Sequence, residues 1–251
     1  MRDIVKDRAV VLKTYEYGES SVVAVALTRS HGKVRFLAKG ARRPQSPLRG
    51  GLFPGGVCET VFYFRPDGGL QILKECDEAE GGTAPANDLE RLCIFQAGLE
   101  IVDRAVIGQD ADERLFDLIE AFMRLARSAE DPWALFYALE IGVLSLAGSL
   151  PTFDECAQCG SDLAEGRFAV DPASGRVSCA KCLRDPRRAL SAGSSAALAL
   201  LARGGCDAAR FPLDRAERRE IGELLHRLFS SHVEGYRLPA ALRLCKGVNG
   251  Q

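Results

Sequence analysis

Residues 9–39 read AVVLKTYEYGESSVVAVALTRSHGKVRFLAK, and this stretch decides the fold of the N-terminal part of the chain. Valine, alanine and aromatic residues dominate it, and turn signals at Gly18 and at His31-Gly32 divide it. The stretch therefore predicts three short consecutive strands, at Ala9–Glu16, Ser21–Leu27 and Lys33–Lys39.

Two more strands are predicted directly downstream. Val57–Phe64 alternates between two faces, and the turn Asp67-Gly68-Gly69 leads into Leu70–Lys74. Residues 40–56 are rich in Gly, Pro and Arg, which predicts a long loop between the third and fourth strands. Five short strands in about 70 residues suit a small closed barrel of the OB type.

The rest of the chain carries helical signals. Asn87 and Glu90 have capping-box spacing, and Asp131-Pro132 is typical of an N-cap followed by proline at the first helical position. The helix after Pro132 is apolar nearly all round, so it is predicted to be central and buried. Helices are predicted at Asp88–Ile107, Asp110–Arg127, Trp133–Ala147, Ser194–Ala202 and Leu213–Glu234, the last with a cap formed by Asp214 and Glu217.

The fold class is therefore α+β. An N-terminal five-stranded OB-fold barrel at 1–80 precedes a mostly α-helical domain at 81–251, which carries a zinc ribbon at about 151–188.

The apolar stripe of the predicted helix Asp88–Ile107 consists of Leu89, Leu92, Leu99, Val102 and Val106. His232 falls among apolar residues and is expected to be a core or capping histidine. The carboxylates of the second helix, Asp112, Glu113, Asp117 and Glu120, are expected to face solvent.

Two C-x-x-C pairs mark the ribbon, Cys156 with Cys159 and Cys179 with Cys182. Four thiolates from two such turns provide the tetrahedral ligand set of zinc, and they leave no open coordination position. We therefore predict one structural Zn²⁺. Phe168–Gly175 is predicted to form a strand and turn between the pairs; two redox C-x-x-C pairs are the alternative. The other cysteines, which lack such spacing, are expected to be small core residues: Cys58, Cys76, Cys93, Cys206 and Cys245.

The chain has 251 residues and a net charge of −1, but its charges are unevenly distributed. Residues 81–155 are strongly acidic, whereas no acidic residue lies between Glu19 and Glu59. A one-signed stretch of this length predicts a polyanion partner. Its candidate DNA contacts are Lys33, Arg35, Lys39, Arg42, Arg43 and Arg49, and Arg29 belongs to the same stretch. Arg215, Arg219 and His226 form a basic stripe on the last helix that could make secondary contacts or only be solvated. Candidate rings for base stacking are Tyr15, Tyr17, Phe36, Phe53 and Tyr63, although most barrel aromatics are core.

Several functional classes are excluded by what the sequence lacks. It contains no P-loop, no dinucleotide fingerprint after a strand, and no H-E-x-x-H motif. No catalytic residue can be named, so the sequence predicts a protein that is not an enzyme. No run of apolar residues is long enough to span a membrane, and no secretory signal is visible, so a cytoplasmic protein is expected.

Three segments resemble one known family. The opening residues Val10–Val25, the basic segment Lys39–Arg43 followed by Leu48–Leu52, and the closing segment Leu225–Leu242 with His232, Gly235 and Leu238 resemble the RecO family of bacterial DNA repair and recombination mediators. The four-cysteine segment resembles that of its metal-binding members.

The resemblance implies a protein without catalytic activity in the RecF pathway of homologous recombination. Members bind single- and double-stranded DNA, anneal complementary strands, and act with RecR and RecF to load RecA on coated single strands. They contact the C-terminal tail of single-strand-binding protein. The resemblance therefore implies DNA contacts on the basic loops of the barrel and a nucleoid-associated bacterial location.

Two alternatives remain open at this point. A zinc-ribbon protein of transcription or translation would bind RNA more tightly than single-stranded DNA of equal length. A metal-dependent nuclease or hydrolase would need an open metal position, which four cysteine ligands do not leave.

Overall fold

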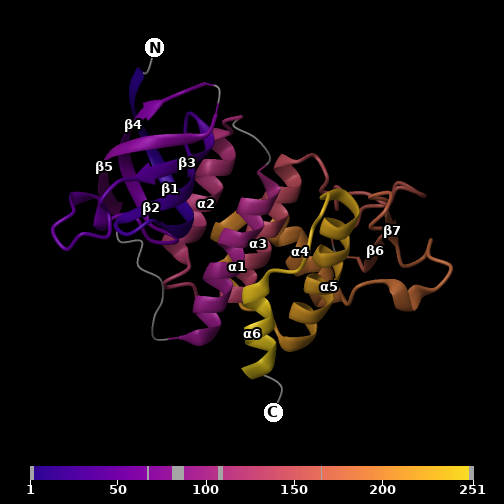
Figure 1. The fold of residues 1–251 in the computed structure, drawn as a ribbon. Coiled ribbons are helices and arrows are strands. Elements are labelled where there is room, and N and C mark those ends of the chain that lie inside the picture. Colours follow the sequence, from indigo (N-terminus) through magenta and orange to yellow (C-terminus); the bar gives the residue numbers. More distant parts are fainter. Residues whose placement is uncertain (1–2, 67, 81–87, 107–109, 165, 249–251) are drawn as a thin grey trace. The chain divides into compact units, whose positions relative to one another are not determined.

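A computed structural model describes residues 3–66, 68–80, 88–106, 110–164 and 166–248 (Figure 1). The chain divides into two compact units, Met1–Arg127 with Ala240–Gln251, and Ser128–Pro239. The first unit is larger than the predicted barrel domain because three helices group with the barrel. The predicted division at residue 80 stays a prediction.

The first unit is built on a closed barrel with the strand order β1-β2-β3-β5-β4. Its strands are β1 (Asp3–Tyr17), β2 (Ser21–Thr28), β3 (Gly32–Ala38), β4 (Val57–Phe64) and β5 (Leu70–Glu80). β1 pairs antiparallel with β2 and β4, and β3 closes the barrel by parallel pairing with β5. The predicted OB barrel is confirmed. β1 begins earlier than expected because its charged first residues pair with β4, and β5 runs on to Glu80.

Alternate residues of the strands fill the inside of the barrel. The Phe36 and Phe62 rings are fully buried and meet edge to face at 4.9 Å between centroids. The Cys58 and Cys76 thiols also lie inside, beneath Gly51, where an added Cβ would come within 2.8 Å of the Cys76 Sγ. The prediction that the irregularly spaced cysteines are core residues is confirmed, since all five are buried.

Three helices belong to the barrel's unit: α1 (Leu89–Ala105), α2 (Glu113–Leu125) and α6 (Ala240–Val248), together with the short 3₁₀ helix η1 (Pro47–Arg49). The N-cap of α1 is Asp88, which accepts the Arg91 N–H, whereas the predicted cap Asn87 lies outside the described residues. The sequence did not predict α6. Its first N–H groups, at Ala240 and Ala241, donate to the Glu100 carboxylate of α1 at 2.8 and 3.1 Å.

α1 packs directly against the loop that precedes β4. Gly55 has a φ of +85°, and an added Cβ would lie 2.0 Å from the Phe95 ring of α1. Only glycine allows both this backbone conformation and this close approach. The predicted stripe of α1 is wrong at Leu89, which is 50% exposed because it lies in the first turn; Ile94 and Phe95 are buried instead.

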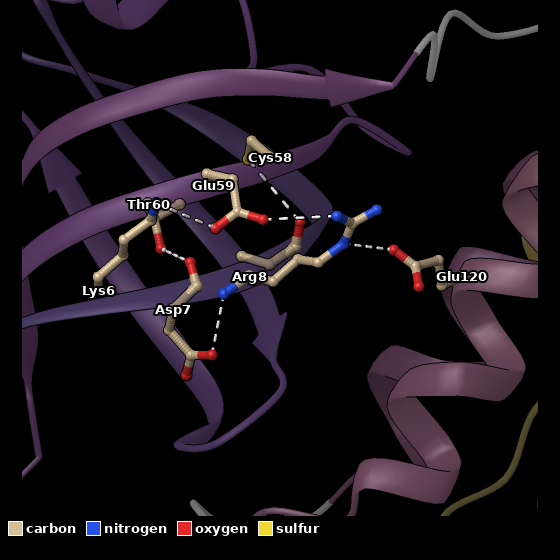
Figure 2. A network of polar contacts seen from close by, with 8 residues as sticks. Lys6, Asp7, Arg8, Cys58, Glu59, Thr60 and Glu120 are labelled. Atoms are coloured by element: carbon tan, nitrogen blue, oxygen red, sulfur yellow. Dashed lines mark hydrogen bonds and ion pairs between the residues drawn. The ribbon is translucent and has the colours of Figure 1, made fainter.

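Ion pairs join α2 to the barrel (Figure 2). The Arg8 guanidinium of β1 donates to Glu120 of α2 at 2.6 Å and to Glu59 of β4 at 3.4 Å. Arg29 pairs with Asp117 of α2 at 2.8 Å. Glu113 and Asp117 are exposed, as expected, although Arg29 approaches both. The expectation that the α2 carboxylates face solvent is wrong for Glu120, which is half-buried against Arg8. Asp112 instead caps α2 by accepting the Arg114 N–H.

The second unit contains α3 (Pro132–Leu146), α4 (Ala192–Gly204), α5 (Arg215–His232), the hairpin β6 (Phe168–Val170) and β7 (Val177–Cys179), and the 3₁₀ helices η2 (Pro186–Arg188) and η3 (Gly205–Arg210). α3 is buried along most of its length, as predicted, and begins with Pro132 after the N-cap Asp131. Asp131 also accepts the Leu213 N–H at 2.7 Å and pairs with Arg218 at 3.2 Å. One carboxylate thus caps α3 and fixes the start of α5.

Glu140 lies within buried α3. Removal of its carboxyl from water raises its pKa to about 8. Nearby on the same helix, the Tyr137 hydroxyl donates to the Arg218 carbonyl at 2.8 Å. Although α3 is strongly apolar, no helix within the described part of the chain is both long and apolar enough to cross a membrane.

α5 has the predicted capping box, since Asp214 accepts the Glu217 N–H and Glu217 accepts the Asp214 N–H. His232 was expected to be a core or capping histidine, and the structure places it outside the core, in the last turn of α5. His232 is exposed because α5 ends at this residue, and its Nε2 lies 2.8 Å from the Pro172 carbonyl of the ribbon.

Candidate nucleic-acid surface and metal centre

One half of the barrel's outer surface is covered within the first unit. Val10, Val25 and Leu27 alternate with inward residues and so point outward, yet all three are buried. The barrel surface on this side carries ion pairs to α1 and α2, as for Lys13, whose Nζ lies 2.6 Å from Asp103 of α1. These outward residues are therefore covered and do not form a binding surface themselves.

The other half of the outer surface is open. Strand register places five residues side by side across all five strands, and we call them the outer row: Tyr15, Val23, Leu37, Ile72 and Tyr63. Tyr15 is 51% exposed, and the other members are half-buried. A continuous row with a tyrosine at each end forms an apolar platform of the kind on which bases stack.

Cations border the outer row. The Lys74 ammonium lies 5.8 Å from the Tyr63 ring centroid. The Lys13 ammonium lies 5.7 Å from the Tyr15 ring centroid, but Asp103 of α1 already pairs with it. Arg35 is exposed on the same face, because it lies two residues before Leu37 on β3. The row therefore combines apolar rings with positive charge.

The predicted cations of the acid-free stretch differ in their surroundings. Lys33 lies 2.8 Å from Asp103 Oδ1 and also donates to the Asp103 and Val106 carbonyls at the end of α1. A cation at this position satisfies carbonyl groups that the helix leaves unpaired. Lys33 is therefore held by the end of α1, whereas Arg29 pairs with the exposed carboxylates Glu113 and Asp117 of α2.

Four of the remaining predicted contacts, Arg35, Lys39, Arg42 and Arg43, are exposed. Arg42 pairs with Glu16 at 3.1 Å, but both side chains are exposed, and such pairs stabilise a protein by only about 0–1 kcal/mol. The side chain of Arg49 lies outside the described residues.

The predicted stacking rings differ in their exposure to solvent. Phe36 is fully buried and Phe53 is half-buried, whereas Tyr15 and Tyr17 are exposed. Alternation within one strand places Tyr15 and Tyr17 on the same face. Placing Tyr15 in one row with Tyr63 required the pairing register of all five strands, which residue types alone do not provide. The contact of the Lys74 ammonium with the Tyr63 ring also placed Lys74 beside the row.

The predicted secondary contacts lie on α5, in the second unit. Arg215, Arg219 and His226 are all exposed, and the His226 Nδ1 lies 3.3 Å from the Tyr236 hydroxyl. Their role as DNA contacts stays a prediction.

The two C-x-x-C pairs meet at the base of the β6–β7 hairpin. The Sγ atoms of Cys156, Cys159, Cys179 and Cys182 all lie within 4.8 Å of one another. The Cys159 and Cys179 sulfurs are 3.8 Å apart. A tetrahedral zinc with bonds of about 2.3 Å separates its sulfur ligands by about 3.8 Å, so the cluster fits this metal.

A backbone N–H group stabilises the thiolate form of one cysteine in the cluster. The Cys179 N–H donates to the Cys156 Sγ at 3.3 Å, and this bond is the main cause that lowers the pKa of Cys156 to about 6. The pKa of Cys182 is raised to about 12, chiefly by its hydrogen bond with Cys159. Because metals bind thiolates, the low pKa of Cys156 favours binding at neutral pH.

The fold and the cysteine cluster define the class: an OB-fold protein that also carries helices and a four-cysteine cluster. The closed barrel with β3 parallel to β5 is an OB fold, and it occurs in one chain with helices and a four-cysteine cluster that is close enough to bind a metal ion.

Comparison with known proteins identifies the family within this class. Residues 1–81 match the family model "Recombination protein O N terminal", and residues 86–241 match "Recombination protein O C terminal". The chain therefore belongs to the RecO family. It is 34% identical to the DNA repair protein RecO of Anaeromyxobacter dehalogenans strain 2CP-C over 241 residues, which cover 95% of this chain and 94% of that protein. It is 30% identical to the protein of that name from Moorella thermoacetica, over 72% of this chain and 67% of that protein.

Proposed function

We propose that this chain is a DNA repair protein that acts as a recombination mediator. In this role it binds single- and double-stranded DNA through the open half of the barrel and anneals complementary strands. The outer row is the observation that carries the proposal, because Tyr15 and Tyr63 offer stacking surfaces at its two ends. Exposed Arg35, Lys39 and Arg43 supply phosphate contacts, and Arg42 joins them by exchanging Glu16 for a phosphate.

The zinc supports this function indirectly. Cys156, Cys159, Cys179 and Cys182 would hold one Zn²⁺, and a metal with four protein ligands stabilises the ribbon without offering a catalytic position. The proposed activity therefore requires no chemical step. It needs only charge neutralisation and alignment of two strands.

Binding to single-stranded DNA tests the barrel directly. We expect Tyr15→Ala and Tyr63→Ala each to weaken binding of a fluorescein-labelled oligonucleotide at least fivefold, since stacking of one base contributes about 1–3 kcal/mol. Tyr15→Phe keeps the ring and should bind normally. Phe211→Ala removes an equally exposed ring from the second unit and is the matched control. Unchanged affinity in both alanine variants would contradict the proposal.

RNA binding is the competing function. An RNA oligonucleotide of the same length and sequence should bind no more tightly than the DNA. If RNA binds more tightly and depends on Tyr15 and Tyr63, the outer row serves an RNA-binding protein instead.

The partners extend the proposal. With RecR, and with RecF, the chain would help load RecA on single strands coated by single-strand-binding protein, whose C-terminal tail it would contact. RecA ATPase activity on coated strands reports loading, and it should rise only when this chain and RecR are both present. These partners imply a cytoplasmic, nucleoid-associated location.

A further inference from the structure

An ion pair lies at the Tyr15 end of the outer row. The Arg42 Nη1 is 3.1 Å from the Glu16 Oε2, and Glu16 follows Tyr15 directly on β1. Strand register sets Glu16 opposite Val22 of β2, and it sets Val22 opposite Ala38 of β3. This line of residues runs directly beside the outer row, so the ion pair lies at the border of the row.

The backbone at Arg42 is held independently of this ion pair. The Arg42 N–H donates to the Ser20 carbonyl in the turn between β1 and β2 at 2.9 Å. The neighbouring Ala41 side chain is buried in the core of the barrel. Neither contact involves the guanidinium group, so the Arg42 side chain can leave its carboxylate partner by rotation, without movement of the turn that carries it.

Both side chains of the pair remain open to solvent. The Glu16 side chain is 74% exposed, and that of Arg42 is 39% exposed. Water screens such a pair, so the pair adds little to the stability of the fold. Its removal should therefore change DNA binding rather than folding.

Glu16 brings a negative charge next to three exposed cations. Lys39, Arg42 and Arg43 belong to the turn that follows β3. A phosphate that reaches Arg42 must displace the Glu16 carboxylate, because that carboxylate already balances the charge of the guanidinium group. Within a DNA complex the displaced carboxylate stays on β1 beside the arginine and competes for it again.

We propose that Glu16 competes with DNA phosphate for Arg42, and so limits how tightly and for how long the open half of the barrel holds a strand. The inference rests on the proposed function and adds a regulation of that same site. Annealing gives the competition a use, because a protein that aligns two strands must release their duplex. A phosphate contact that breaks an internal ion pair is weaker than one made by a free cation, so it is given up first.

Glu16→Gln in the full-length protein tests the competition, since it keeps the size of the side chain and removes the charge. For a fluorescein-labelled single-stranded oligonucleotide at about 50 mM salt, we expect the Kd of the variant to be about three- to fivefold lower than that of the wild-type protein. Exposed ion pairs set this limit, since fivefold corresponds to about 1 kcal/mol. After a chase with unlabelled DNA, the complex should dissociate more slowly by a similar factor. The gain should shrink at about 300 mM salt, because salt screens exposed pairs.

Glu19→Gln is the matched control. Glu19 is an exposed carboxylate in the turn between β1 and β2, and it forms no ion pair with any residue that the structure describes. Its removal should raise affinity by less than about twofold, through long-range attraction alone. Arg42→Ala provides the second control. In that background Glu16→Gln should have no larger effect than Glu19→Gln, since the group for which Glu16 competes is absent.

Equal effects of Glu16→Gln and Glu19→Gln would overturn the inference. An undiminished gain in the Arg42→Ala background would also overturn it, because the carboxylate would then act only through its field. Weaker DNA binding by Glu16→Gln would do the same, since the pair would then hold Arg42 ready for DNA. The proposed function fails separately, through unchanged binding in Tyr15→Ala and Tyr63→Ala.

Discussion

The salt dependence of DNA binding should distinguish the exposed cations of the barrel from those held by helices. The informative change is the triple variant Arg35→Ala, Lys39→Ala and Arg43→Ala. These side chains are exposed, whereas Lys33 is held by Asp103. Each phosphate contact contributes about −0.7 to the slope of log K against log salt for a single strand.

With Arg42, four side chains can contact phosphates, so we expect a wild-type slope of about −3 and a triple-variant slope of about −1. Between 50 and 200 mM salt, the wild-type protein should then lose about fiftyfold in affinity and the triple variant about threefold. Anisotropy titrations of one labelled oligonucleotide at four salt concentrations measure both slopes.

Two controls accompany the measurement. Lys33→Ala should keep the wild-type slope but lower the free energy of unfolding by about 1–3 kcal/mol, since it removes a partly buried charged hydrogen bond. The triple change Arg114→Ala, Arg124→Ala and Arg203→Ala removes equal charge from exposed helix positions and should keep the slope. A folded Arg35, Lys39 and Arg43 variant with the wild-type slope would refute the assignment.

Three other expectations concern zinc and stability. Elemental analysis should find one zinc ion per chain, and native protein without zinc would contradict this. Cys159→Ser should lose the zinc and destabilise the ribbon, while the affinity for single-stranded DNA stays close to that of the wild-type protein. Glu140→Gln should raise the free energy of unfolding above pH 5, because the wild-type carboxyl ionises readily only in the unfolded chain. The free energy of unfolding of the wild-type protein therefore falls by up to about 1.4 kcal/mol per pH unit until the pH reaches the folded pKa of Glu140, about 8. Urea titrations at pH 5 and pH 8 should show a smaller difference in stability for the variant than for the wild-type protein. Hydrogen bonds from Lys13 and Lys33 lower the pKa of Asp103, so the ionised carboxyl stabilises the fold at a pH above its unfolded pKa, and this stabilisation is lost on acidification. Asp103→Asn should therefore be less stable than the wild-type protein at pH 7 and lose less stability below pH 4. Parallel curves of unfolding free energy against pH for the two proteins would exclude this role.

Local sequence signals were sufficient where one segment determines its own structure. The turns at Gly18 and Gly32 and the proline start of α3 each depend on neighbouring residues, and their predictions were confirmed. The cysteines of the two C-x-x-C pairs lie close together, as expected, while the bound zinc stays a prediction.

Local sequence signals did not predict contacts between residues that lie far apart in the sequence. The α2 carboxylates were expected to face solvent because their barrel partners, such as Arg8 for Glu120, lie about a hundred residues away in sequence. The contact of Lys33 with the end of α1 was missed for the same reason, since that helix comes much later in the chain; its role as a DNA contact stays a prediction. The outer row also depends on register between strands, which a residue pattern within one strand cannot specify.

The contact between Glu100 and the start of α6 bears on the order in which the chain folds during synthesis. The barrel, α1 and α2 leave the ribosome first, but the helix that completes their unit follows only after residues 128–239 have been made. Until then, the Glu100 carboxylate can pair with Arg104 of its own helix, but the side of α1 that receives α6 lacks that helix. The intervening unit is a contiguous segment and can fold as soon as it emerges. The nascent chain is thus expected to finish its second unit before its first, and the last helix joins the two ends of the barrel's unit.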